Sequence, residues 1–173
     1  MTELTERAPT LATVYLGWDR FQRDLVKAVA PLSEGQLALP AAPNHWPIGM
    51  LVQHILNDRL WWFNMWMGEG SPETAAYMHW DEEEAGRSVH SAAELVAGLE
   101  ATWGMIEAAL NRWTVADLEQ VIEQPASLTE RERTIFGPST RQWIIFHVLR
   151  HDMHHGGELA VGMGGHQLPT IWG

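Results

Sequence analysis

The sequence FHVLRHDMHHGGEL, residues 146–159, carries three histidines four residues apart, at His147, His151 and His155. Because residues four apart on an α-helix have Cβ atoms about 6 Å apart, two neighbouring imidazoles of this stripe can bind one metal ion. The stripe offers two such pairs, and spacing alone does not choose between them. A single helix cannot close a coordination sphere, so a further ligand must come from a facing helix. These residues therefore predict a helix packed against a second, ligand-bearing helix.

His54 is the candidate for that further ligand. It lies in a second predicted helix, residues 47–67, which begins at Pro47, a residue suited to a first helical turn, and stops at two glycines. At about 100° per residue, His54 and Asp58 share one side of this helix with apolar and aromatic side chains. Three neutral imidazoles leave a fourth position open for water or substrate, as in catalytic metal sites. The pattern thus predicts an accessible metal centre.

Four stretches have the three-and-four apolar spacing of amphipathic helices. They cover residues 10–30, 47–67, 91–113 and 139–163. Each of the last two opens with a capping box, S-x-x-E or S-x-x-Q, in which the serine and the third residue after it satisfy the first free N–H groups of the helix. Helices of three to six turns whose connections permit antiparallel neighbours predict an all-α fold, a four-helix bundle.

The chain between the third and fourth helices has no sustained period. We expect a short strand pair there, around residues 121–123 and 133–136. The 173 residues, 19.5 kDa, are the size of one domain, and neither a repeat nor a low-complexity segment divides them. We therefore expect a single domain spanning residues 1–173.

The charge balance limits the partners of this chain. Its net charge of −11 comes from 22 acidic against 11 Lys and Arg residues, with no basic patch. An acidic surface repels DNA and anionic membranes, so small molecules, metals or other proteins are the expected partners, without nucleic acid. No run of about 18 apolar residues could span a membrane, and the acidic start does not resemble a secretory signal. We expect a cytoplasmic protein.

Two residue counts add further expectations. The chain has no Cys, so any thiol chemistry would use a thiol brought by a substrate or cofactor. It has ten Trp, more than the core of one modest domain needs. Excess apolar surface usually marks an interface, so we expect a homodimer formed through a helix face.

Two segments resemble the family of DinB/YfiT-like metalloenzymes, whose fold is a four-helix bundle with three metal-binding histidines. WPIGMLVQHILNDRLWW, residues 46–62, is similar to the family's second-helix segment, and HVLRHDMHHGGELAVGMGGHQLP, residues 147–169, to its last helix. The resemblance implies His54, His151 and His155 as ligands, because the family's second HxxxH ligand precedes a glycine-containing segment, as His155 does here. Many relatives have Arg-Gly-Gln after that histidine, where this chain has Gly-Gly-Glu.

The resemblance also implies an activity, because characterised members are thiol-dependent transferases or isomerases using small thiols such as bacillithiol, mycothiol or glutathione. A divalent metal such as Zn, Ni or Fe lowers the pKa of a coordinated thiol, which suits transfer of sulfur to an electrophilic small molecule. Metal-assisted hydrolysis is one alternative, with water as nucleophile. A non-catalytic metal-binding protein is the other.

Two carboxylates lie near the expected ligands. Asp58, four residues after His54, fits an acceptor that fixes an imidazole tautomer, a fourth ligand, or an ordinary surface residue. Glu158 fits a general base, or a residue one turn beyond the site. Either carboxylate could serve as base in the hydrolytic alternative. Asp58 and Glu158 are therefore the candidate catalytic residues.

Overall fold

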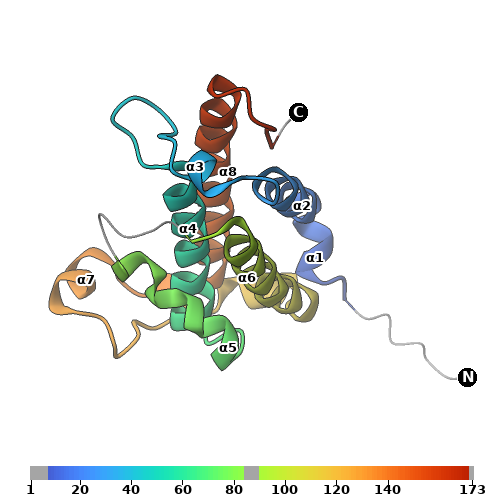
Figure 1. Cartoon of the computed structure of the whole chain (residues 1–173). Helices are drawn as coiled ribbons and strands as arrows, with labels where there is room; N and C mark the ends of the chain where they lie inside the picture. Colours follow the sequence, from blue (N-terminus) through green and yellow to red (C-terminus); the bar gives the residue numbers. More distant parts are fainter. Residues whose placement is uncertain (1–7, 84–89, 172–173) are drawn as a thin grey trace, which may run out of the picture.

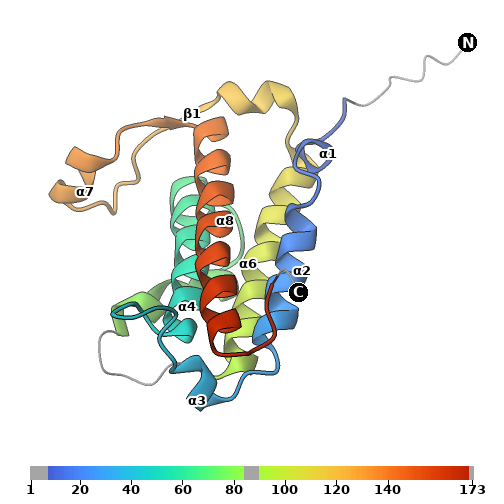
Figure 2. The same cartoon turned by 90° about the horizontal axis from the view of Figure 1, so that it is seen from above.

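The computed structural model describes residues 8–83 and 90–171, and its frame is four long helices that run alongside one another (Figures 1 and 2). These are α2 (Trp18–Val29), α4 (Ile48–Arg59), α6 (Ala92–Arg112) and α8 (Arg141–Gly165). In Figure 2, α2 and α8 run one way and α4 and α6 the other, so α8 is antiparallel to its neighbour α4. The all-α bundle expected from the sequence is confirmed.

Shorter elements join the long helices. They are α1 (Leu11–Val14), α3 (Glu34–Leu37), the π-helix η1 (Leu60–Trp66), α5 (Pro72–Ala75), the 3₁₀ helices η2 (Ala76–Glu83) and η3 (Val115–Glu119), and α7 (Glu130–Ile135). The inward faces of the long helices are apolar and form one core, in which most side chains are fully buried. In the described part of the chain, no helix is long and apolar enough to cross a membrane.

The first predicted helix is interrupted. Gly17 has a φ of +99°, a left-handed conformation that side-chain-bearing residues rarely adopt, and it separates α1 from α2. The α1 turn is hydrogen-bonded to the end of α6 instead, because Leu11 N donates to Trp113 O at 2.8 Å. The apolar spacing continues across the break, so it does not reveal the change of direction.

The predicted strand pair is present with a different second strand. β1 (Val121–Ile122) pairs antiparallel with β2 (Ser139–Thr140). Residues 133–136 were expected to supply the partner, but they belong to the end of α7 and its cap, because Thr129 and Glu132 form a capping box that starts a helix there. Thr140, rather than Ser139, caps α8 and accepts from Trp143 N.

The helix that carries His54 changes its winding as it leaves the site. α4 passes without interruption into the π-helix η1, and a loop begins at Gly68, as expected from the sequence. A π-turn holds more residues per turn than an α-turn, so it rotates the following side chains relative to α4. In this way η1 directs Trp62, Phe63 and Trp66 into the core.

Candidate metal centre

Helices α4 and α8 bring three imidazoles together: His54 from α4, and His151 and His155 from α8. The ring of His54 lies 4.7 Å from each of the other two rings, and those two are 4.3 Å apart. Nε2 of His54 is 3.0 Å from Nε2 of His151. One ligand nitrogen from each residue lies within 4.8 Å of the others, so this histidine triad could hold a metal ion.

His147, the remaining histidine of the four-residue stripe on α8, lies outside the triad. Its ring is 6.2 Å from that of His151 and stacks on Trp143 at 5.0 Å. Its Nδ1 contacts Arg150 Nη2 at 3.3 Å, and its Nε2 faces Asp58 at 3.4 Å. Of the two pairs that the spacing left open, His147/His151 and His151/His155, only the second converges with His54 in the structure.

Asp58 lies on the side of the His151 ring that faces away from His54. Its Oδ2 is 3.5 Å from Nδ1 of His151, whereas the other ring nitrogen of His151 faces His54. Within the described residues, Asp58 Oδ2 and His151 Nδ1 are buried without an ordinary hydrogen bond. A metal-ligating imidazole normally donates its second N–H to a carboxylate or carbonyl. This placement fits a carboxylate that orients His151 better than it fits a fourth ligand.

Glu158 stands in the same relation to His155. The carboxylate Oε2 is 2.6 Å from Nδ1 of His155, which favours the tautomer with a proton on Nδ1 and leaves Nε2 to ligate a metal. Partial burial raises the pKa of Glu158, but the hydrogen bond from His155 and the charges of nearby histidines together hold it below its ordinary value. Glu158 is therefore in contact with the triad and not one turn beyond it.

The surroundings of the triad lower the pKa values of two of its histidines. Burial, followed by repulsion from His155 and His54, lowers the pKa of His151 from 6.5 to about 2. Burial also lowers the pKa of His155. Because a histidine ligates metal only through an unprotonated nitrogen, these shifts favour the form that binds metal at neutral pH. The donor set and its two carboxylate partners fit a divalent transition metal.

The loop of residues 40–47 forms one wall beside the triad. Trp46 meets His54 edge-on at 5.1 Å. The loop is closed by a hydrogen bond from Ala41 N to Trp46 O, 2.9 Å, and it packs directly on α8. A Cβ added at Gly162 of α8 would lie 2.5 Å from Ala41 O, so this approach requires glycine.

A pocket of about 300 Å³ opens between this loop and α8. Its lining is small and apolar apart from one histidine and one carboxylate: Ala41, Ala42, His45, Gly157, Glu158 and Val161. Because Glu158 also contacts the triad, the pocket adjoins the candidate metal centre. Sequence reasoning did not identify His45 or Trp46, since neither belongs to a periodic helix.

A buried ionic network lies beneath the site and was also not foreseen. Arg59 and Asp152 are fully buried, and Arg59 Nη2 is 2.7 Å from Asp152 Oδ2. Trp18 Nε1 donates to the same oxygen at 2.7 Å, and Arg59 Nη1 donates to Gln22 Oε1 at 2.7 Å. Gln22 Nε2 in turn donates to Leu99 O at 2.9 Å. The network thus joins all four long helices next to His151.

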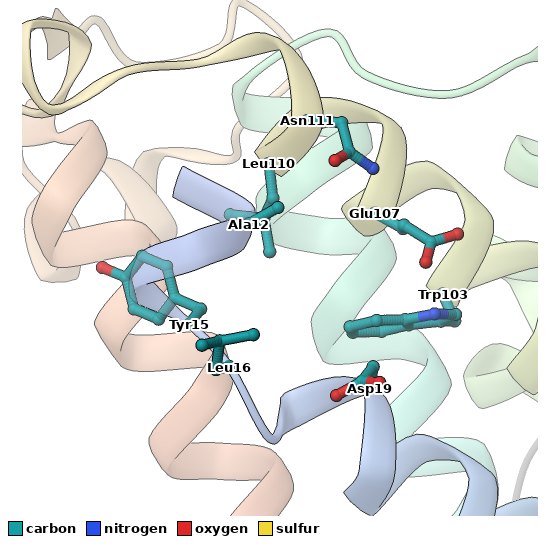
Figure 3. Close-up of a pocket in the computed structure, with 8 residues that line it drawn as sticks. All are labelled: Ala12, Tyr15, Leu16, Asp19, Trp103, Glu107, Leu110 and Asn111. Carbon is teal, nitrogen blue, oxygen red and sulfur yellow. The ribbon is translucent and has the colours of Figure 1, made fainter. Parts of the chain in front are cut away.

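A second groove lies on another part of the molecule. It has a volume of about 190 Å³, and Figure 3 shows its side chains between α6 on one side and α1 and the start of α2 on the other. They are Ala12, Tyr15, Leu16, Asp19, Trp103, Glu107, Leu110 and Asn111. The lining has two carboxylates but no histidine, so the pocket beside the triad is the better candidate for metal-dependent chemistry.

The comparisons with known proteins agree with this architecture. A profile of the DinB superfamily matches residues 18–159. The crystal structure of a DinB-like protein from Bacillus cereus ATCC 10987 is similar over 94% of this chain and 96% of that chain, with a TM-score of 0.64 and 19% sequence identity. At this identity the similarity concerns the fold. No match was found among curated proteins.

Proposed function

Since the chain belongs to the DinB superfamily and brings three imidazoles together beside a pocket, we propose that it is a metal-dependent enzyme that transfers a low-molecular-weight thiol to an electrophilic small molecule. The observation that carries the proposal is the donor set of three histidines, which is typical of catalytic rather than structural zinc sites. A divalent metal held there, such as Zn, Ni or Fe, would supply Lewis-acid chemistry that lowers the pKa of a thiol.

The two carboxylates orient the ligands in this proposal. Asp58 faces Nδ1 of His151 and Glu158 accepts from Nδ1 of His155. Each thereby favours the tautomer whose Nε2 carries a lone pair. Fixed tautomers and ring orientations reduce the reorganisation needed to bind a metal, so both carboxylates act as positioning residues for the triad.

Glu158 has a further role in the proposal, because it also lines the pocket. Like an ordinary carboxylate it is ionised at neutral pH, so it can accept the proton that a bound thiol loses, although its lowered pKa makes it a weak base. The small, largely apolar lining suits the uncharged part of a small substrate. The absence of Cys means that no thiol of the chain competes for the electrophile.

The proposal can be tested with metal-depleted protein that is reloaded with Zn²⁺, Ni²⁺ or Fe²⁺ in separate samples. Each sample is incubated with a small thiol and a chromogenic electrophile, and the thioether is measured by mass spectrometry. We expect product with metal and none after chelation. His151→Ala should lose both bound metal and product, since it removes a central ligand.

Two further variants sharpen the test. Glu158→Gln should keep its metal but turn over about 10²–10⁴-fold more slowly, the usual contribution of a general base. His147→Asn, outside the triad, should retain both metal and activity. Hydrolysis without thioether formation would favour the hydrolytic alternative, and no turnover by metal-loaded protein would favour a non-catalytic metal-binding protein.

A further inference from the structure

Glu158 contacts two histidines that are not members of the triad, in addition to His155. Its Oε2 is hydrogen-bonded to His155, but its Oε1 lies 3.5 Å from Nε2 of His154 and 3.5 Å from Nε2 of His45. We propose that His45, His154 and Glu158 form a second binding site for a divalent transition-metal ion, at the edge of the pocket beside the triad.

Two of the three separations between the ligand atoms agree with those of a metal site. In a tetrahedral site with metal–ligand bonds of about 2.1 Å, neighbouring ligand atoms are separated by about 3.4 Å. Both contacts of Glu158 Oε1 match that separation, and two imidazoles with one carboxylate suit Zn²⁺ or Ni²⁺. The His45 and His154 nitrogens are not close enough as they stand, since with Glu158 they do not form a group whose ligand atoms all lie within 4.8 Å of one another. Their side chains are 36% and 64% exposed, so rotation can bring the two imidazoles around one ion.

The backbone holds the three side chains near each other. His154 and Glu158 are four residues apart on α8, the spacing at which two side chains on one helix face can share a metal. His45 belongs to the 40–47 loop, where Asn44 adopts a left-handed φ of +60° and His45 N donates to Ala42 O at 3.0 Å. That loop packs on α8 at Gly162, so His45 is held over the same helix.

The second site differs from the triad in exposure and in charge. Each member of the triad is half-buried and the donor set consists of imidazoles alone, whereas the second site is nearer the surface and includes a carboxylate. A surface site with fewer fixed ligands should bind more weakly. The acidic chain, with its net charge of −11, favours the approach of cations to it.

Occupation of this site would affect the triad through Glu158. One carboxylate oxygen would bind the second ion while the other contacts His155, so the carboxylate would be less able to accept a proton from a substrate. The ion would also narrow the pocket that His45 and Glu158 line. Excess metal should therefore inhibit, a consequence that rests on the proposed function; the binding itself does not.

Isothermal titration of untagged, metal-free protein with Zn²⁺, checked by elemental analysis after dialysis, tests the site. We expect wild type to bind two ions per chain with different affinities. The double variant His45→Asn, His154→Asn should keep the tighter ion and lose the weaker one. His151→Ala should show the reverse. Circular dichroism verifies that each variant remains helical.

His90→Asn is the matched control. His90 and Glu94 have the same four-residue spacing, with Nδ1 3.9 Å from Glu94 Oε2, but they belong neither to the triad nor to the proposed second site. This variant should bind two ions like wild type. The proposal is wrong if wild type binds one ion, or if the weaker ion remains in the double variant. A tighter ion that persists in His151→Ala would instead contradict the triad.

Discussion

Replacing Asp152 by Asn should destabilise the protein strongly, although the change removes only a charge. Asp152 and Arg59 are both fully buried, and Arg59 donates to the carboxylate through Nε and Nη2. Without the carboxylate charge, the guanidinium is left uncompensated inside the bundle, which costs about 3–5 kcal/mol. Against a typical total of about 5–15 kcal/mol, this is a large fraction of the free energy of unfolding.

The effect is measured by urea denaturation followed by circular dichroism, with calorimetry for the melting temperature. For a chain of this size, about 3–5 kcal/mol corresponds to a lowering of the melting temperature by about 6–20 °C. The slope of the urea transition should not change, because the surface exposed on unfolding stays the same.

Asp19→Asn is the matched control. Asp19 also pairs with an arginine at 2.7 Å, Arg23, but the two side chains are 45% and 68% exposed. Solvent screens such a pair, so its loss should cost less than about 1 kcal/mol. If Asp152→Asn costs no more than Asp19→Asn, the buried pair does not stabilise the bundle in the way described.

Three other outcomes are expected. Gly162→Ala should lower the unfolding free energy by about 1–3 kcal/mol, because the new Cβ meets a loop carbonyl oxygen. Gly157→Ala, with open space around it, should be neutral or raise the unfolding free energy by up to about 1 kcal/mol through helix propensity. Equal effects of the two variants in urea denaturation would contradict the close approach at Gly162. The metal-free protein should lose stability as the pH falls below about 6.5. In the unfolded chain His151 takes up a proton near that pH, whereas in the folded protein its pKa is about 2 and it stays unprotonated. Unfolding curves that are unchanged between pH 7 and pH 4 would refute this. The protein should be a homodimer by light scattering at micromolar concentration, with Phe146→Glu shifting it toward monomer, because Phe146 on α8 is 58% exposed; a monomer mass for wild type would end this expectation.

Much of the fold could be anticipated because its signals are local. Apolar spacing and capping residues depend on side chains within a few positions of each other, and they located the long helices. The expected partner of β1 was wrong, because contacts between residues far apart in the chain decide strand pairing. A short strand such as β1 can pair with several segments, and the actual partner, Ser139–Thr140, is the one left available once Thr129 has started α7.

For the candidate site, the sequence by itself determined which helices carry the histidines, since four-residue spacing aligns them on one face whatever the surroundings. The spacing left the pairs His147/His151 and His151/His155 open, and the family resemblance implied the second pair. Only the tertiary structure brings that pair to His54 and leaves His147 outside, because this depends on how α4 and α8 are rotated and offset against each other. The pairing of Arg59 with Asp152 and the approach of His45 to Glu158 join residues far apart in the chain. No periodicity encodes such contacts, because they arise from the packing of the whole bundle.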